Sequence, residues 1–336
     1  MSYNIWNRRY TGSKYKLSEW IVELVSRHCS GNSFCDIFAG TGIMSYSMLG
    51  VVDELYINDF LFSNEIIYKA FFENATYDII KLKNIKSLYN NLNVTDLSDN
   101  YCSQWYGDRF FSYNDAKLIG YIREHIEMLK NEFNEKEINI LIASLLYSAD
   151  KAANTVGHYD AYIKGKNVED KFIFDLINPY DTKEKNIVIT RCDANEYASR
   201  LQSDIVYIDP PYNSRQYSRF YHVLENIACW EKPKLYGEAL KPEPQNMSEY
   251  CRSNAPTVFK NLIDTLNCKY IVVSYNNTYK SKSSSSKNKI TLEKIRDILE
   301  DKGTMQVFDK SHQYFNAGKT DFTDHREYIF IVKVGD

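Results

Sequence analysis

The sequence predicts an α/β fold, in which a mostly parallel sheet is covered by helices and interrupted by an inserted, mainly helical domain. Two observations support this prediction. An apolar segment at 34–38 is followed by a glycine-containing turn, a helix-like segment and a second strand-like segment that ends at Asp59. Helical spacing then dominates from about 62 to 179, and strand-like segments return from 186 on. A strand, a glycine turn, a helix and another strand in this order begin a Rossmann-like sheet.

The individual elements follow from their residue patterns. Apolar residues at helical spacing predict a helix at 14–29, and residues 43–49 open another behind the glycine turn. Within the inserted segment, the same spacing predicts helices at 117–130 and 135–149. Runs of branched and aromatic residues predict strands at 34–38, 54–58, 186–190, 204–208, 269–275 and 326–334. The low-complexity run at 280–289 is expected to be mobile.

Composition limits the classes of protein that the chain can represent. The formal net charge of the 336 residues is -3, so any binding of nucleic acid needs a local basic face rather than a polycationic chain. The seven cysteines include no C-x-x-C pair, and the His and Cys spacing gives no metal site. No apolar run approaches the roughly 18 residues that span a membrane, and no secretory leader is recognisable. We therefore expect a cytoplasmic protein.

The segment Phe38-Ala-Gly-Thr-Gly42 is a turn of small residues directly after a predicted strand. Glycine lets the backbone approach a ligand where a Cβ atom would not fit. The segment lacks the full G-x-G-x-x-G of dinucleotide binders and the Gly-Lys-Ser/Thr ending of a phosphate loop. Asp59 ends the next strand, where it is placed to accept hydrogen bonds from ribose hydroxyls. A ligand without a diphosphate or triphosphate suits this pattern, although a tight helix–sheet turn would give the same residues.

A second motif, Asp209-Pro-Pro-Tyr212, follows the predicted strand at 204–208. Prolines cannot donate to a sheet ladder, so the strand ends here and the motif forms a stiff extended turn. The Asp209 carboxylate and a proline carbonyl can accept hydrogen bonds from one exocyclic amino group, while Tyr212 can stack on a flat ring. An amine of adenine type needs both kinds of help, because its lone pair is delocalised into the ring. A proline-capped strand explains this motif alone, but not its combination with the glycine turn and Asp59.

Together these motifs resemble those of the Dam-like, or alpha, group of DNA adenine-N6 methyltransferases. The resemblance rests on RRYTGSKYKL at 8–17, the glycine turn and Asp209-Pro-Pro-Tyr212, in that order, and it spans residues 8 to about 334. The stretches ANTVGHYDAYIK at 153–164 and DPPYNSRQYSRFYHVLENIA at 209–228 are similar to members from restriction-modification systems. The resemblance implies a methyltransferase sheet that uses S-adenosyl-L-methionine and no metal.

The resemblance also implies a set of cofactor-binding residues. The N-terminal motif is expected to close over the methionine end of the cofactor, the glycine turn to hold it, Asp59 to bind its ribose and Asp193 to bind its adenine amino group. The implied set is Tyr10, Gly12, Lys14, Asp36, Phe38, Ala39, Gly40, Asp59, Asp193, Ala194 and Asp209.

The resemblance assigns the chemistry to four consecutive residues, Asp209, Pro210, Pro211 and Tyr212. Family members cradle a flipped base at this motif and transfer the methyl group in line from sulfonium to nitrogen. Base flipping is needed because an amine inside a duplex cannot be reached in the stack. We expect Asp209 to accept a hydrogen bond from the amine rather than to deprotonate it, so that the proton leaves after methyl transfer.

Recognition of DNA is expected to involve both halves of the chain. Residues 1–61 and 186–336 are predicted to form the catalytic domain, and 62–185 an inserted helical domain that recognises the DNA target, because sequence readout needs side chains in a groove. Polar, basic and aromatic residues near the catalytic motif and in the stretch 158–166 are candidates for contact with DNA. The candidates are Asn213, Arg215, Gln216, Arg219, His158, Tyr159 and Lys164.

Three alternatives to adenine-N6 methylation of double-stranded DNA stay open. Cytosine-N4 methylation uses the same chemistry, but serine more often replaces the aspartate there. Methylators of RNA or of protein glutamine share the turn and more often begin it with asparagine. A cofactor-binding DNA-recognition module without catalysis is the third, and the intact motif at 209–212 argues against it. A cognate restriction endonuclease is the expected partner in the same system, without a stable complex.

Overall fold

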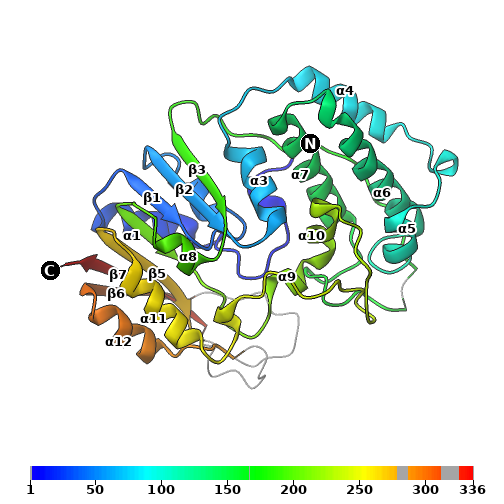
Figure 1. Cartoon of the computed structure of the whole chain (residues 1–336). Helices are drawn as coiled ribbons and strands as arrows, with labels where there is room; N and C mark the ends of the chain where they lie inside the picture. The colour runs from blue at the N-terminus through cyan, green and yellow to red at the C-terminus, as the bar shows by residue number, and fades with distance from the viewer. Residues whose placement is uncertain (1, 166, 278–286, 312–324, 336) are drawn as a thin grey trace. The chain divides into compact units, whose positions relative to one another are not determined.

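The structure, a computed structural model, describes residues 2–165, 167–277, 287–311 and 325–335 (Figure 1). The chain forms two compact units, and each unit is assembled from separate stretches of sequence. The helical unit contains Met1–Gly12, Leu61–Lys183 and Tyr217–Gln245, and the sheet unit contains Ser13–Phe60, Glu184–Gln216 and Asn246–Asp336. Among the described residues, no helix is both long enough and apolar enough to cross a membrane.

The sheet unit is built on one sheet with the strand order β3-β2-β1-β4-β5-β7-β6 (Figure 1). Its first five strands pair in parallel, whereas β7 runs antiparallel to β5 and β6. The bounds are β1 Ser33–Asp36, β2 Glu54–Asp59, β3 Asn186–Arg191, β4 Ile205–Ile208, β5 Tyr270–Asn276, β6 Gly303–Ser311 and β7 Arg326–Val334. The strand order reverses between β1 and β4, and open α/β sheets bind ligands at the carboxyl ends of the strands beside such a reversal.

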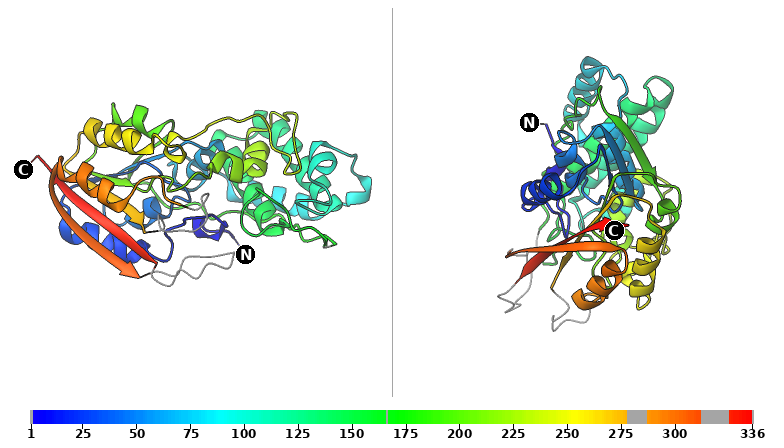
Figure 2. Two further views of the ribbon diagram at one scale, coloured as in Figure 1. Left: turned by 90° about the horizontal axis from the view of Figure 1, so that it is seen from below. Right: turned by 90° about the vertical axis from the view of Figure 1, so that its left-hand side faces the viewer.

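The central strands are apolar because helices cover both faces of the sheet. All four residues of β1 and of β4 are buried. Val206 and Ile208 pack in one core with α8, α11 and α12, and the hairpin of β6 and β7 is seen at the sheet edge in Figure 2. The helices of this unit are α1 Ser18–His28, α2 Ile43–Met48, α8 Ala194–Ala198, η4 Glu249–Cys251, α11 Ala255–Thr265 and α12 Leu292–Glu300.

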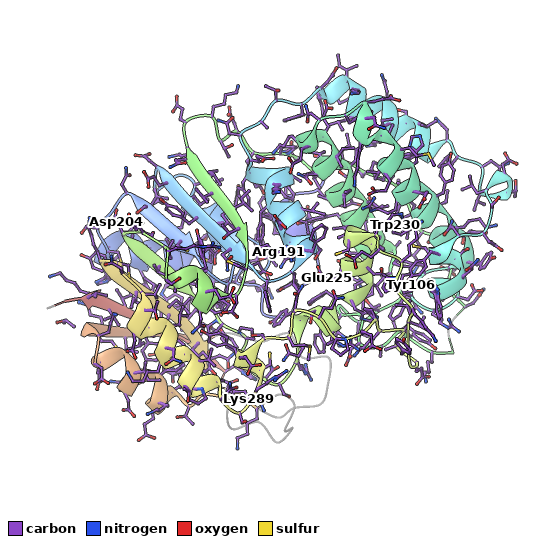
Figure 3. All side chains as sticks on the ribbon, viewed as in Figure 1. Tyr106, Arg191, Asp204, Glu225, Trp230 and Lys289 are labelled. Atoms are coloured by element: carbon purple, nitrogen blue, oxygen red, sulfur yellow. The ribbon has the colours of Figure 1, made fainter. Side chains whose placement is uncertain are left out.

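The amino ends of the central strands are tied together by one carboxylate, so the opposite ends are left for a site. Asp204 Oδ2 accepts a hydrogen bond of 2.7 Å from the backbone of Asn32, directly before β1. Lys269, directly before β5, pairs with Asp204 at 2.7 Å. In Figure 3, Asp204 lies at the amino end of β4 and Arg191 lies at the carboxyl end of β3.

The helical unit is organised around α7 (Glu135–Ala152), which is buried on nearly every side. A helix buried all round needs neighbours on each face, and α3, α6 and α10 provide them. Buried Arg123 of α6 donates hydrogen bonds to the carbonyls of Ile227 and Ala228, which end α10. The other elements are η1 Ile5–Asn7, α3 Phe62–Phe72, α4 Ile79–Asn90, η2 Val94–Asp96, α5 Tyr101–Tyr106, α6 Tyr113–Met128, η3 Leu129–Asn131, α9 Tyr217–Phe220 and α10 His222–Cys229.

The predicted α/β class is confirmed, and every predicted strand is present within a few residues of its expected bounds. Sequence patterns missed β6, which forms the outer edge of the sheet. The compact units differ from the division at 61/62 and 185/186, since 1–12 and 217–245 pack with the helical unit. Which part of the chain recognises DNA stays a prediction. Most of the run at 280–289 lies outside the described residues.

Candidate active site

The motif at 209–212 leaves β4 at the point where the strand order reverses. The strand ends at Ile208, and Asp209 follows in non-regular backbone before Pro210 and Pro211. The carboxyl group of Asp209 is thereby held at the carboxyl edge of the sheet, in the position where parallel sheets carry their chemistry. Pro210 is buried, and among the described residues no donor is bonded to its carbonyl oxygen. The turn thus presents a carboxylate with a neighbouring carbonyl that has acceptor capacity left.

Four polar side chains, from three parts of the sheet unit, are linked to Asp209 either directly or through one another. Lys14 Nζ lies 2.8 Å from Asp209 Oδ1 and 2.8 Å from Oδ2, while the Tyr212 hydroxyl donates to Asp209. Glu327 of β7 shares this hydroxyl proton, since its Oε1 lies 3.0 Å from the Tyr212 hydroxyl oxygen, and it lies 3.4 Å from Lys14 Nζ. Ser274 of β5 completes the group by donating to Glu327 Oε1 at 2.6 Å. We call Lys14, Asp209, Tyr212, Ser274 and Glu327 the ammonium–carboxylate cluster.

The electrostatics of the ammonium–carboxylate cluster follow from one cation between two anions. Burial raises the pKa of Asp209, Lys14 opposes this change, and the carboxylate of Glu327 adds to it. Burial alone would lower the pKa of Lys14, but the two carboxylates outweigh it, so that this pKa is raised and the ammonium stays charged. Burial, Asp209 and Glu327 all raise the pKa of Tyr212, which keeps its hydroxyl protonated as a donor.

The ring of Tyr212 packs edge-on against Tyr275, with ring centroids 4.6 Å apart. Lys14 Nζ lies 4.9 Å from the centroid of the Tyr212 ring, close enough for a cation–π contact. The side chain is thus fixed at its ring and at its hydroxyl. Stacking of the ring on a target base stays a prediction.

The glycine turn after β1 is held in place by the end of β2. Gly40 has a φ of 54° and Gly42 a φ of 77°, a region of backbone conformation that favours glycine. The Gly40 amide donates to Asp59 Oδ2 at 2.8 Å, and the Ala39 amide donates to the carbonyl of Asn58 at 2.9 Å. Asp59 therefore positions the turn, which leaves its role toward a ribose as a prediction.

Asp36, the last residue of β1, is only 1% exposed. Its Oδ2 accepts hydrogen bonds from the amide of Ser45, at 3.2 Å, and from the Ser45 hydroxyl, at 2.8 Å. Among the described residues, nothing is bonded to Oδ1, the other oxygen of this carboxylate. Burial raises the pKa of Asp36 to about 7, and the hydrogen bonds from Ser45 oppose this change. A buried carboxylate with one unused oxygen is suited to a cationic group of a ligand.

The remaining predicted cofactor residues fall into two groups. In the sheet unit, Asp193 caps α8 by accepting from the amides of Asn195 and Glu196, Ala194 is buried behind it, and Phe38 packs edge-on against Tyr250. In the helical unit, Tyr10 stacks on Tyr221 with centroids 4.7 Å apart, and the carbonyl of Thr11, next to Gly12, accepts from Tyr217. The structure thus gathers Lys14, Asp36, Phe38, Ala39, Gly40, Asp59, Asp193, Ala194 and Asp209 in the sheet unit.

Several residues predicted to contact DNA are engaged within their own unit. Gln216 exchanges two hydrogen bonds with the backbone of Ser248, at 2.9 and 2.7 Å. Arg219 donates to the carbonyl of Pro242, and Lys164 pairs with Glu238. The ring of His158 stacks on Phe220, with centroids 4.7 Å apart, and Asn213 accepts from the backbone amide of Arg215.

Tyr159 requires a correction. It was expected on a face that binds DNA, but its side chain is 0% exposed. Its hydroxyl donates to Asp150 Oδ1 at 3.0 Å, and its amide donates to the carbonyl of Phe220 at 2.7 Å. The aromatic and basic pattern around it suggested a surface, whereas the ring belongs to the interior of the helical unit.

Two members of the ammonium–carboxylate cluster, Ser274 and Glu327, escaped sequence analysis. Both lie on predicted strands, where their neighbours are apolar. The one signal in the sequence was Glu327, a charged residue near the start of an otherwise apolar strand. This signal did not indicate which side chains Glu327 would contact in the folded protein.

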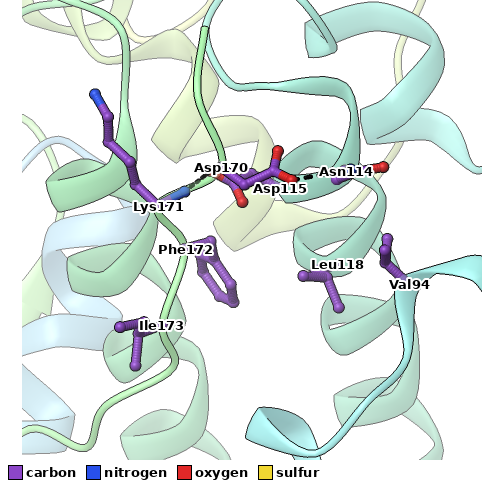
Figure 4. A pocket seen from close by; sticks show the side chains of 8 residues that line it. All are labelled: Val94, Asn114, Asp115, Leu118, Asp170, Lys171, Phe172 and Ile173. Carbon is purple, nitrogen blue, oxygen red and sulfur yellow. Dashed lines mark hydrogen bonds between the residues drawn. The ribbon is translucent and has the colours of Figure 1, made fainter.

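A separate pocket lies in the helical unit (Figure 4). Its lining residues are Val94, Asn114, Asp115, Leu118, Asp170, Lys171, Phe172 and Ile173. The carboxylates there are used by the fold, because Asp115 accepts from the amide of Lys171 at 2.8 Å and Asp170 accepts from Asn114 at 2.9 Å. Among the described residues, no group of His, Cys, Asp and Glu is arranged to bind a metal ion. The ammonium–carboxylate cluster therefore remains the candidate for chemistry.

Comparison with known proteins agrees with this geometry. Residues 10–298 match the family model of D12 class N6 adenine-specific DNA methyltransferases. The chain is 30% identical to the type II methyltransferase M.NlaIII of Neisseria lactamica, over 96% of this chain and 98% of that protein. It is 30% identical to M.CviAII of Paramecium bursaria Chlorella virus 1, over 97% and 98% of the two chains.

A longer relative matches in the same way. M.FokI of Planomicrobium okeanokoites is 31% identical over 97% of this chain, which spans 52% of the length of M.FokI. The family match covers both the glycine turn and the motif at 209–212, and the sheet has the Rossmann-like order of a methyltransferase. The chain belongs to the D12 class of N6 adenine-specific DNA methyltransferases.

Proposed function

We propose that the ammonium–carboxylate cluster and the carbonyl of Pro210 carry the methyl transfer to adenine N6, beside a cofactor held by the glycine turn. As a member of its family, the chain is an enzyme that methylates adenine N6 in DNA. The observation that supports the site is the buried carboxylate of Asp209 at the reversal of strand order, next to a carbonyl that can accept a second hydrogen bond. These two acceptors match the two N–H groups of an exocyclic amine.

The residues around Asp209 orient the amine and take up its charge. Asp209 and the Pro210 carbonyl accept from the two N–H groups, which turns the nitrogen lone pair toward the methyl donor. The nitrogen–methyl bond forms as the sulfur–methyl bond breaks, and the positive charge passes to nitrogen. Asp209 stabilises this charge at close range and then accepts the proton that leaves. Pro211 keeps the turn stiff, and the ring of Tyr212 borders the place of the flipped base.

S-adenosyl-L-methionine is the methyl donor that a methyltransferase family of this fold implies, and it supplies an electrophilic methyl group. The residues fit it, since Asp36 offers one unused oxygen of a buried carboxylate to the amino group of the methionine part. The glycine turn lets its backbone approach the cofactor closely. We assign Asp59 to the ribose and Asp193 to the adenine amino group. Tyr10 and Gly12 are proposed to close over the methionine end.

Double-stranded DNA is the proposed substrate, and a flipped adenine is the proposed target. Asn213 and Arg215 follow the catalytic turn directly and are partly exposed, so we assign them to contact with DNA. Gln216, Arg219, His158 and Lys164 remain candidates that would have to give up contacts within the fold. The type II names of the relatives support a role in a restriction-modification system, for which we propose a cognate endonuclease as the partner. A cytoplasmic location is part of the same proposal.

The test is to express the chain in cells that lack DNA methylation and to sequence their DNA by a modification-sensitive method. N6-methyladenine at one short repeated motif is expected, and digestion to nucleosides distinguishes it from N4-methylcytosine. Asp209→Ala should abolish the modification, while Asp264→Asn, which changes an exposed carboxylate of the same unit, should retain it. Full methylation by Asp209→Ala would overturn the assignment of the site.

A further inference from the structure

Glu327 is a buried carboxylate of the ammonium–carboxylate cluster, and none of the individual steps described above is assigned to it. It is 5% exposed and lies near the start of β7, opposite Asn276 of β5 in the sheet register. Its carboxylate accepts from Ser274 and from the hydroxyl of Tyr212, and it lies 3.4 Å from Lys14 Nζ. A buried carboxylate is costly unless its environment uses it, so its place beside Asp209 calls for a reason.

The reason lies in how Lys14 is shared. Without Glu327, the ammonium of Lys14 and Asp209 would form a closed pair, and a carboxylate held in such a pair is a weaker acceptor for another donor. With Glu327 present, one ammonium and one phenol hydroxyl are divided between two carboxylates. Asp209 thereby keeps electron density for the amine of the substrate.

We propose that Glu327 is a positioning residue for methyl transfer, which holds Lys14 and the Tyr212 hydroxyl and so keeps Asp209 available as an acceptor. The proposal rests on the assignment of the chemistry to Asp209. It extends the functional site to the antiparallel end of the sheet, because Glu327 is supplied by β7 and is held by Ser274 of β5. Neither strand carries a residue of the sequence motifs.

The proposal predicts a particular pH dependence. Asp209 must be ionised to accept from the amine, and the carboxylate of Glu327 raises the pKa of Asp209. Replacing Glu327 by glutamine removes that charge and keeps the shape, so Asp209 should ionise at lower pH while it becomes a poorer acceptor. The charged or titratable groups around Glu327 and Asp209 are Lys14, Tyr212, Tyr207 of β4, Asp36 of β1 and Lys310, the register partner of Glu327 on β6.

The experiment measures the single-turnover rate of transfer of a labelled methyl group to genomic DNA from a methylation-deficient host, between pH 5 and 9. Glu327→Gln should lower the rate roughly 10- to 100-fold and move the acid limb of the profile down by about one pH unit. Glu327→Asp keeps the charge and should retain the acid limb, with part of the rate recovered. Glu300→Gln, the same substitution at an exposed site of the sheet unit, should behave as the wild type.

The outcomes distinguish the role of Glu327 from the role of Asp209. A wild-type rate for Glu327→Gln, or a lower rate with an unmoved acid limb, overturns the proposal and leaves the role of Asp209 standing. Full activity of Asp209→Ala overturns the proposed function itself. If Glu327→Gln fails to fold, Ser274→Ala removes one hydrogen bond to Glu327 and keeps both carboxylates. It should then lower the rate roughly threefold to tenfold, and a wild-type rate would overturn the proposal.

Discussion

Asp36 makes the free energy of unfolding depend on pH. Burial raises the pKa of this carboxyl to about 7, whereas an unfolded aspartate titrates near 3.9. Between roughly pH 4 and pH 7 the folded protein therefore holds a proton that the unfolded chain has lost. The contribution of Asp36 to the free energy of unfolding is therefore largest below about pH 4, and it is lost as the pH rises through about 7. About three pKa units correspond to roughly 4 kcal/mol in total, of which about 3 kcal/mol are lost between pH 5 and pH 8.

Asp36→Asn removes this ionisation and keeps an oxygen that can accept from Ser45. We expect the free energy of unfolding of the variant, relative to the wild type, to rise by about 3 kcal/mol between pH 5 and pH 8. Urea unfolding of both proteins without ligand, at fixed ionic strength and at four pH values, measures this difference. Asp264→Asn serves as the exposed control. A difference between Asp36→Asn and wild type that stays constant with pH would refute the reasoning.

Two further predictions concern contact with DNA. Tyr159→Phe should lower the free energy of unfolding by roughly 1–2 kcal/mol, because it removes the hydrogen bond to buried Asp150. The same variant should bind DNA with unchanged affinity. Urea unfolding measures the first effect, and a binding titration measures the second. Loss of affinity in a stably folded Tyr159→Phe would restore this residue to the DNA-binding set. Arg215→Ala should reduce the slope of log affinity against log salt by about 1, if its guanidinium neutralises one phosphate, and an unchanged slope would count against that contact.

Much of the sheet could be predicted because its central strands are short, apolar and bounded by turn residues. β4 and β7 were expected almost at their observed bounds. β6 was missed because it is an edge strand with no fully buried residue, which ends in three exposed polar residues, so its sequence lacks the apolar run of its neighbours. The predicted division of the chain also missed that 217–245 packs with the helical unit, since local spacing does not state which core a helix joins.

The members of the site that lie within its motifs were predicted from the sequence. Lys14 and Asp209 lie within recognisable segments, and the structure brings them within 2.8 Å of each other. Glu327 and Ser274 could not be predicted, because only the antiparallel pairing of β5 with β7 places them beside Asp209. Tyr159 was misassigned because an aromatic residue among basic ones has the same local sequence whether it faces solvent or the core.

The strand order also determines how long β1 stays without its partner β4 while the chain is being synthesised. β1 is an inner strand of the sheet, and its partner on one side, β4, begins at Ile205, after the whole segment that supplies most of the helical unit. On the ribosome, the edge of β1 that pairs with β4 stays unpaired while about 170 further residues are added, which takes roughly ten to thirty seconds. Unpaired backbone N–H and C=O groups of a strand can pair with other chains during that interval. We expect the yield of folded protein to depend on chaperones and on growth temperature more than the stability of the finished enzyme would suggest.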